Sequence, residues 1–333
     1  MTQMLPTPVA KVAPAFGLVL GALGIVYVVW GSTYLAIRIV VEQAPPLTSM
    51  GLRYSTAAVV LGLLLMLRGG PRRLRLTRRQ ALGTAFLGLM LPVLGNGMVA
   101  VAENLGAPSG VAALLIAATP LLIVLFRVVD GDRPRPLSLA GVLLGFAGLA
   151  VLVLVGGGAA DGFPVGPALL VVFAAACWAF GSYAQPRLWL PQDVFVTAVY
   201  EMLFGGLILL VVGRLAGESF TAAAYGPRTW TALGYLVVFG SVVAFTSYVW
   251  LLANAPISFV ATYAYVNPVV AVVLGWLVLD ERVTWAVVAG GGIVVGAVAL
   301  VIGAERPRRG NAPESAVAGE PRPVNQISGD EPD

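Results

Sequence analysis

The side chains of this sequence that are best suited to chemistry are aromatic, amide and hydroxyl groups set inside long apolar stretches. Hydrocarbon cannot hydrogen-bond a polar group, so such residues are expected to face a protein cavity or another helix. Aromatic faces attract cations and apolar groups, while amides and hydroxyls orient a ligand. The chemistry they predict is reversible binding of a small amphipathic molecule. The candidate cavity residues are Trp30, Tyr34, Asn96, Thr119, Trp178, Ser247, Tyr263, Tyr265 and Asn267.

Three charged residues also lie within apolar stretches, namely Arg53, Glu103 and Glu201. A central arginine costs about 2.5–3.5 kcal/mol to insert, so these charges need a reason to be there. Glu103 lies at the end of its stretch that should be nearest to Arg53, and it is a candidate ion-pair partner. Glu201 lies in the opposite leaflet and is a candidate protonatable site. Structural pairing or gating, and coupling to protons, both remain open for these charges.

Several classes of reaction lack the residues that they need. The sequence has no histidine, one cysteine (Cys177) and one lysine (Lys11). It therefore offers no Cys/His metal site, no intrachain disulfide and no thiol–imidazole pair. No paired aspartates occur within the apolar stretches, and no glycine-rich phosphate loop with a lysine is present. We expect neither an enzyme nor a metal or cofactor. Nucleic acid is not an expected partner either, because the arginines cluster beside apolar stretches.

The composition requires a lipid environment. Hydrophobic residues make up 59% of the 333 residues and charged residues only 11%, whereas soluble domains carry about 25% charged residues. A helix needs roughly 20 apolar residues to cross about 30 Å of hydrocarbon. We therefore predict an all-α polytopic membrane protein with ten transmembrane helices. They begin near Ala15, Leu47, Ala81, Pro108, Leu137, Pro167, Val194, Thr231, Ile257 and Val283.

The basic residues predict how the helices are oriented. One side of the membrane would carry Lys11, Arg68, Arg72, Arg73, Arg75, Arg78, Arg79, Arg127, Arg133, Arg135, Arg187, Arg306, Arg308, Arg309 and Arg322. The other side would carry Arg38, Arg214, Arg228 and Arg282. By the positive-inside rule both termini are cytoplasmic, in a plasma (inner) membrane. Residues 1–14 would be an N-terminal tail before an uncleaved first span, and residues 304–333 a disordered cytoplasmic tail.

The chain contains an internal repeat at an offset of 148 residues. Trp30 falls on Trp178 and Pro120 on Pro268. Further matches are Ala107-Pro108 with Ala255-Pro256, Asp132 with Asp280, Gly148 with Gly296, and Arg53 with Glu201. We predict two repeats, residues 15–156 and 163–303. Five helices per repeat is an odd number, so the second repeat must be inverted, as in secondary transporters. The alternative is a duplication that only stabilises the bundle.

Glycines and prolines predict different roles for different spans. The pairs Gly141/Gly145 and Gly292/Gly296 have the small-xxx-small spacing of close helix packing, which assigns the fifth and tenth spans to a scaffold. Proline removes a helical hydrogen bond and frees a carbonyl. A carbonyl freed by Pro120 or Pro268, beside Thr119 or Asn267, is a candidate ligand for an ammonium or hydroxyl group. The alternative is a kink required only for packing.

The motifs around these residues resemble those of EamA-domain transporters. They are Trp30-Gly-Ser-Thr-Tyr34, Arg53-Tyr54, Gly95-Asn-Gly-Met98 with Glu103-Asn104, Trp178-Ala-Phe-Gly-Ser-Tyr183 and Ala264-Tyr-Val-Asn-Pro-Val-Val-Ala271. The likeness covers residues 15 to 303 and is greatest to the YedA-type inner-membrane proteins of the drug/metabolite transporter (DMT) superfamily. It implies two inverted EamA repeats, cytoplasmic termini, and a central cavity shared by spans one, three, four, six, eight and nine. It also implies export of amino acids, metabolites or hydrophobic drugs without ATP.

Residues and resemblance together predict a secondary transporter. It would export small metabolites, amino acids or amphipathic and cationic drugs, across the plasma membrane by alternating access, with protons as a candidate coupling ion. A doubly charged substrate fits poorly, because few charges lie within the spans. A passive facilitator or channel is the alternative, as is uptake rather than export. A monomer and a homodimer both remain open, and the sequence identifies no individual substrate.

Overall fold

The structure is a computed structural model of the chain and describes residues 16–156, 163–255, 260 and 262–305. The N-terminal tail predicted at 1–14 lies outside these residues. So do Pro256 and the segment from residue 306 onward, which includes nearly all of the tail predicted at 304–333. The charges counted on Lys11, Arg306, Arg308, Arg309 and Arg322 are outside as well.

The first five spans are built from eight α-helices with π-helical segments between some of them. They are α1 (Phe16–Ile25), η1 (Val26–Trp30) and α2 (Gly31–Val41); α3 (Pro46–Gly69); α4 (Arg78–Gly88), η3 (Leu89–Gly97) and α5 (Met98–Asn104); α6 (Ser109–Ile116) and α7 (Thr119–Val129); and α8 (Pro136–Ala150) with η4 (Val151–Val155). A short 3-10 helix, η2 (Pro71–Leu74), joins the second span to the third.

The second five spans follow the same order. They are α9 (Val165–Ala184) with η5 (Gln185–Arg187); α10 (Val194–Leu215); α11 (Pro227–Tyr235), η7 (Leu236–Val243) and α12 (Ala244–Asn254); α14 (Tyr263–Leu279); and α15 (Trp285–Glu305). The short helix η6 (Ala222–Ala224) precedes the eighth span. Nine helices of the described residues are long and apolar enough to cross a membrane, and α14 is a shorter apolar helix. The prediction of an all-α membrane protein of about ten spans is confirmed.

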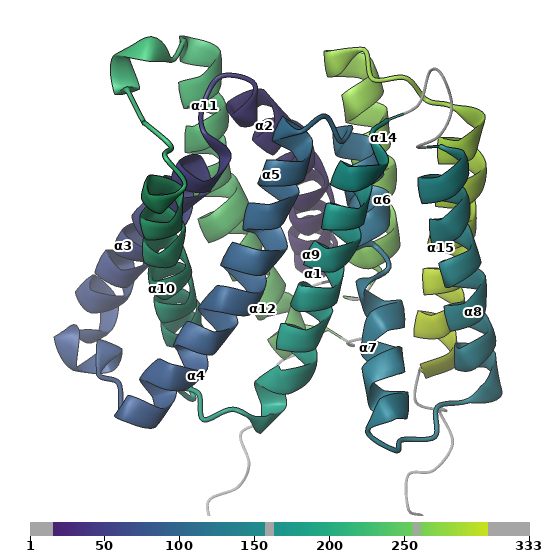
Figure 1. Cartoon of the computed structure of the whole chain (residues 1–333). Helices are drawn as coiled ribbons and strands as arrows, with labels where there is room; N and C mark the ends of the chain where they lie inside the picture. The colour runs from purple at the N-terminus through teal and green to yellow at the C-terminus, as the bar shows by residue number, and fades with distance from the viewer. Residues whose placement is uncertain (1–15, 157–162, 256–259, 261, 306–333) are drawn as a thin grey trace, which may run out of the picture.

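Successive spans run in opposite directions (Figure 1). The described chain begins at Phe16 and ends at Glu305 on one face, here called the terminal face. The loops after α3, α7 and α9 lie on that face, and those after α2, α5 and α10 lie on the opposite, distal face. Because the fifth span ends on the distal face, the sixth begins there. The second set of five spans is therefore inverted relative to the first.

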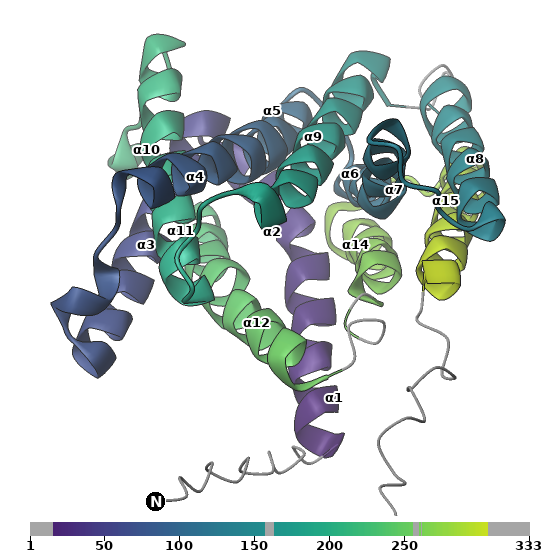
Figure 2. The ribbon, with the colours of Figure 1, turned by 90° about the horizontal axis from the view of Figure 1, so that it is seen from below.

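Helices pair across the two halves in matched ways. Helix α3 packs along α10, the second span against the seventh, and α8 packs along α15, the fifth against the tenth (Figure 2). The first span contacts α12 and α14, whereas α9 contacts η3 and α7. The spans that carry Trp30 and Trp178, the first of each half, thus pack against the third and fourth spans of the opposite half.

The helix breaks fall where the sequence carries polar residues and prolines. In the fourth span the chain breaks at Ala117 and Ala118, and Pro120 sits in the first turn of α7. Pro120 cannot donate to the carbonyl of Ile116. The Thr119 hydroxyl donates to that oxygen instead, at 2.6 Å. The carbonyl that we expected to be left for a ligand is therefore satisfied within the helix.

Two carboxylates of the second half cap helices of the first half on the distal face. Glu218 accepts hydrogen bonds from the backbone N–H of Leu47 and Thr48 at 3.1 and 2.7 Å. Glu281 accepts from the N–H of Ser109 and Gly110 at 2.7 and 3.1 Å. The first N–H groups of a helix lack partners within it, and an acceptor with negative charge also matches the helix dipole. These contacts hold α3 and α6 against the opposite half.

The glycine contacts confirm one predicted packing pair and correct the other. A Cβ built on Gly141 would lie 2.7 Å from Val301, and one built on Gly145 would lie 2.0 Å from Leu121. By contrast, nothing lies within 4 Å of a Cβ on Gly292 or Gly296, so these two do not form a packing seam. The contact of α15 with η4 is made at Gly290 instead, whose Cβ would lie 2.8 Å from Leu152. The 148-residue offset does not specify which way each glycine faces.

We predict that Gly290→Leu destabilises the protein by about 1–3 kcal/mol, because the added side chain must displace Leu152 and the backbone behind it. Gly292→Leu is the matched control on the same helix, and it should change stability by less than about 0.5 kcal/mol. Thermal unfolding in detergent measures both. Equal effects of the two substitutions would contradict this assignment of the packed face.

Candidate functional site

Three aromatic rings from three different spans meet inside the bundle. The Trp30 ring centroid lies 5.1 Å from that of Tyr248 and 5.4 Å from that of Tyr263, and the two tyrosine rings are 5.7 Å apart. The two pairs that include Tyr263 are edge-to-face, an arrangement favoured between aromatic rings. All three side chains are half-buried. We call Trp30, Tyr248 and Tyr263 the aromatic group.

The aromatic group combines residues of both halves. Trp30 ends the π-helical segment η1 of the first span, while Tyr248 lies on α12 and Tyr263 begins α14. The indole N–H of Trp30 donates to the carbonyl of Gly240 in η7 at 3.2 Å. π-Helical segments occur frequently at functional sites, because they misalign backbone groups that an α-helix would pair. The group therefore lies where helix irregularities of two inverted halves meet.

Asn267 holds the first and ninth spans together beside this group. A Cβ on Gly31 would lie 2.7 Å from Val270 and 3.1 Å from the Asn267 carbonyl, so the two helices cross in close contact. In the orientation that its neighbours favour, the Asn267 amide nitrogen lies 3.2 Å from the carbonyl of Tyr27 and 3.3 Å from that of Tyr263. The Tyr27 hydroxyl also hydrogen-bonds Thr262.

The second tryptophan lies in a different environment. A Cβ on Gly95 would lie 2.7 Å from the Trp178 ring, so the ring packs directly on η3 next to Asn96. The ring contacts of Trp30 within the described residues do not include Trp178. At the positions 148 residues before Tyr248 and Tyr263, the chain has Ala100 and Leu115. The aromatic group thus has no counterpart in the other half.

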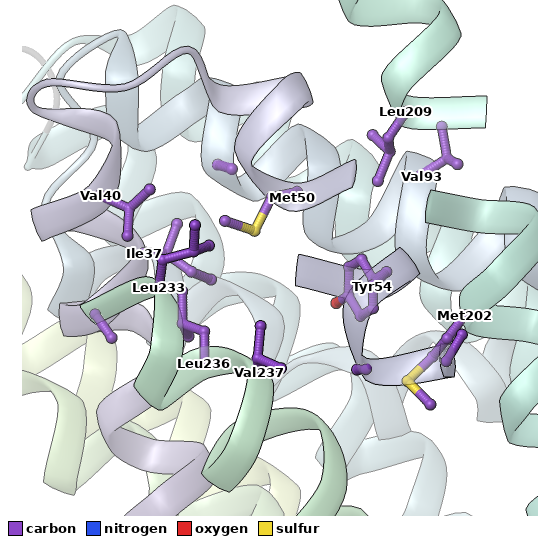
Figure 3. Close-up of a cluster of buried hydrophobic side chains, with 14 of the residues drawn as sticks. Ile37, Val40, Met50, Tyr54, Val93, Met202, Leu209, Leu233, Leu236 and Val237 are labelled. Carbon is purple, nitrogen blue, oxygen red and sulfur yellow. The ribbon is translucent and has the colours of Figure 1, made fainter. Parts of the chain in front are cut away.

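Arg53 is buried beside an apolar cluster. The residue is 4% exposed. Arg53 contacts Met50 and Tyr54 of α3, two members of an apolar cluster that also includes Leu236 of η7 (Figure 3). The Nε–H of Arg53 donates to the Ser241 hydroxyl at 3.0 Å, and Ser241 in turn donates to the Leu236 carbonyl at 3.0 Å. Its guanidinium carbon lies 4.8 Å from the Tyr54 ring centroid, a cation–π contact.

The pair that we expected between Arg53 and Glu103 does not form. Both carboxylate oxygens of Glu103 are buried without a hydrogen-bond partner in the described residues. Arg38 binds the backbone carbonyl of Glu103 instead, and it also lies 3.9 Å from Glu42. The two charges sit on different elements, α3 and α5, and their side chains turn to different neighbours. Glu201 lies half-buried on α10.

The remaining predicted cavity residues are dispersed. The hydroxyl of Ser247 donates to the Val243 carbonyl of its own helix at 3.0 Å, as Thr119 does to Ile116. Tyr34 and Tyr265 are half-buried and pack against a second apolar cluster. Of the nine predicted cavity residues, the structure brings Trp30, Tyr263 and Asn267 together.

A pocket of about 340 Å³ opens at the terminal face between α7 and α9, lined by Arg127, Asp130, Tyr183 and Arg187 among others. Asp130 accepts from the Tyr183 hydroxyl at 2.5 Å and pairs with Arg187 at 2.9 Å, which joins the two halves. On the adjoining loop, the hydrogen bond from Arg127 lowers the pKa of Asp132. Because its pKa is lowered, Asp132 keeps its charge to a more acidic pH than an unpaired aspartate would.

The sequence analysis did not predict the contacts of Tyr248, of Ser241 or of the Asp130–Arg187 pair. Tyr248 was visible as a polar residue within a span, but nothing in its spacing placed it against Trp30. Ser241 lies in an otherwise apolar run, and its role depends on Arg53, 188 residues earlier. The Asp130–Arg187 pair likewise joins residues that are 57 positions apart. Among the described residues no cluster of three or more His, Cys, Asp or Glu side chains could hold a metal.

Comparison with known proteins follows the same division into halves. The sequence model of the EamA-like transporter family matches residues 15–154 and again 166–303. The chain is 40% identical over 284 residues to the uncharacterized inner membrane transporter YedA of Escherichia coli K12, covering 84% of this chain and 89% of that protein.

A more distant relative also matches most of the chain, and one solved structure shares its fold. The chain is 28% identical over 287 residues to a probable terminal-alkyne amino-acid exporter of Streptantibioticus cattleyicolor, covering 84% of this chain and 92% of that protein. A crystal structure of a protein that is 22% identical shares the fold, with a TM-score of 0.60 over 88% of this chain and all of that one.

We predict that Ser241→Ala destabilises the protein by about 1–3 kcal/mol, since it leaves the buried Nε–H of Arg53 without its partner. Ser247→Ala removes a similar hydroxyl from the same span, but that hydroxyl bonds only within its helix. This control should change stability by less than about 0.5 kcal/mol. The readout is thermal unfolding in detergent, and a Ser241→Ala protein as stable as the control would refute the role given to Ser241.

Proposed function

Because this chain belongs to the EamA-like transporter family of the drug/metabolite transporter superfamily, we propose that it is a secondary transporter that exports small amphipathic metabolites by alternating access. Amino acids and related cations are the substrate class that we favour. The observation that carries the proposal is the aromatic group, which is assembled from residues of two inverted halves.

The position of the aromatic group links substrate binding to motion. Trp30 belongs to the first half, whereas Tyr248 and Tyr263 belong to the second. Any movement of one half against the other changes the spacing of these rings. Two similar halves in opposite orientation can exchange conformations, and the exchange exposes one central site to either side. The π-helical segments η1 and η7 in the first and eighth spans, and the break between α6 and α7 in the fourth, supply the places where helices bend.

The chemistry of the group supports a small substrate with a positive or apolar part. Aromatic faces attract ammonium groups with about 0.5–2 kcal/mol, and they also accept apolar side chains. A relative of this chain carries the name of a probable terminal-alkyne amino-acid exporter, which agrees with substrates of this size and polarity. The remaining predicted cavity residues, Tyr34, Asn96, Thr119, Trp178, Ser247, Tyr265 and Asn267, are proposed to line or shape the path.

Orientation follows from the arginines. Arg68, Arg72, Arg73, Arg127 and Arg187 lie at or beside the loops of the terminal face. By the positive-inside rule we assign that face to the cytoplasm, with both termini there, in the inner membrane that the name of YedA specifies for that protein. The pocket between α7 and α9 would then open to the cytoplasm, the side from which an exporter loads.

The proposal also covers the moving units of the chain, its oligomeric state, and the kind and direction of its activity. Residues 15–156 and 163–303 are proposed as the two moving units, as a monomer or a homodimer. Membership of a transporter family supports transport rather than catalysis as the activity. Export is the proposed direction, although the imposed gradient decides the direction of any alternating-access cycle.

We predict saturable counterflow of an amino acid or organic cation in liposomes, and we predict that Tyr263→Leu raises its half-saturating concentration about 3- to 30-fold, the loss of one cation–π contact. Tyr225→Leu makes the same change in an aromatic cluster outside the spans, and this variant should transport normally. Flux that never saturates would favour a passive facilitator. Normal saturation by the Tyr263→Leu protein would remove this residue from the site.

We predict that Glu201→Gln or Glu103→Gln abolishes uphill transport driven by a pH gradient while leaving substrate exchange intact. Glutamine keeps the shape of the side chain, but it cannot take up and release a proton. Carboxylates within spans commonly mark proton paths. Liposome assays with and without a pH gradient, and with Glu42→Gln as a control at the distal face, assign the proton to one carboxylate. Unimpaired driven transport by both variants would exclude proton coupling through these groups.

A further inference from the structure

Arg53 is a cation inside the membrane-spanning bundle that lacks an anion. The residue is 4% exposed, so bulk water solvates its charge poorly. The salt bridges of the described residues do not include it. Cations within membrane spans normally pair with a carboxylate, or they mark a substrate path. For Arg53, no carboxylate of the described residues forms such a pair.

The guanidinium also has unused hydrogen-bonding capacity. Arginine offers five N–H donors in a planar fork. The Nε–H is satisfied by Ser241, whereas Nη1 reaches only the Met50 sulfur at 3.8 Å, a weak acceptor. Within the described residues, neither Nη1 nor Nη2 makes a hydrogen bond to an oxygen. Two N–H groups in a fork are the arrangement that binds a carboxylate with two parallel hydrogen bonds.

Arg53 and the aromatic group converge on one segment of η7. Trp30 donates to the carbonyl of Gly240, and Arg53 donates to the hydroxyl of the next residue, Ser241. A Cβ on Gly240 would lie 3.3 Å from Nη2 of Arg53 and 3.1 Å from Thr33. Because residue 240 is a glycine, the guanidinium can lie against the helix close to the Trp30 side of the bundle. The guanidinium and the aromatic faces thus border the same short stretch of helix.

We propose that Arg53 binds the carboxylate of the transported molecule, so that the substrates are amino acids rather than amines without an acid group. This inference rests on the proposed function and narrows its substrate class. The aromatic group takes the ammonium or the side chain, and the guanidinium takes the carboxylate. The carboxylate supplies both the missing negative charge and the missing acceptors.

The surroundings of Arg53 favour a ligand over an internal partner. Glu103 is the acidic residue that we expected to neutralise it, yet its carboxylate makes no contact with Arg53. Ser241 and Tyr54 hold the guanidinium in place but bring no charge. Their contacts fix the orientation of the fork, which lowers the cost of binding a carboxylate.

The test compares three molecules that differ only at the acid group. The best-transported proteinogenic L-amino acid, its own amide and its decarboxylated amine compete for labelled counterflow in phosphatidylcholine liposomes with phosphate-free buffer. One charge-assisted pair is worth about 1.5–3 kcal/mol, so the amide and the amine should compete about 10- to 100-fold more weakly than the acid. An amide that competes as well as the acid overturns the proposal without any mutant.

Arg53→Gln should reduce the preference for the acid to less than about 3-fold, because glutamine keeps a hydrogen-bond donor but has no charge. Arg38→Gln removes another arginine, near the distal face, and this variant should keep the full preference for the acid over the amide and the amine. A purely structural Arg53 would weaken acid, amide and amine alike, and this outcome would also overturn the proposal. If Arg53→Gln does not fold, the wild-type competition decides alone.

The outcomes separate this inference from the proposed function. Saturable exchange of amines without exchange of any amino acid would retain the transporter and reject the carboxylate site. The absence of any saturable exchange by the wild-type protein would reject both. A requirement for added phosphate or for anionic lipid in the transport of acids would show that another anion neutralises Arg53, and it would reject the carboxylate assignment.

Discussion

Hydrocarbon supplies no hydrogen bonds, and the architecture of this chain depends on that fact. Every polar group within a span must find its partner inside the protein. The constraint explains why the Thr119 hydroxyl takes up the carbonyl that Pro120 releases, and why Glu218 and Glu281 cap helices of the opposite half. It also makes Arg53 informative, since a polar group left partly unsatisfied in such an environment needs another explanation.

The inverted duplication creates a frame that is symmetric and a site that is not. Matched pairs of spans pack along each other, and the first span of each half, which carries Trp30 or Trp178, packs against the third and fourth spans of the opposite half. Around Trp30 the second half supplies two tyrosines, whereas Trp178 packs on Gly95. A frame of equivalent halves permits two similar conformations. An asymmetric site lets a substrate with two chemically different ends bind in one orientation.

The sequence predicted the fold well and the site in part, for identifiable reasons. Spans are local features, since twenty apolar residues must form a helix in lipid whatever surrounds them. The direction in which a residue faces is not local. Gly141 and Gly292 occupy similar motifs, yet one packs against Val301 and the other faces open space. The Arg53–Glu103 pair failed for the same reason, because depth in the membrane does not fix the rotation of a helix.

The sequence by itself determined a lipid-embedded bundle of about ten helices, two inverted repeats, and the family to which the chain belongs. It also identified Trp30, Tyr263, Asn267 and Arg53 as residues that a hydrocarbon environment would not tolerate without a partner. Only the tertiary structure decided that Tyr248 joins Trp30 and that Ser241 holds Arg53. These contacts join residues separated by about two hundred positions. They depend on how helices cross, and crossing is decided by packing between helices rather than by the composition of any one of them.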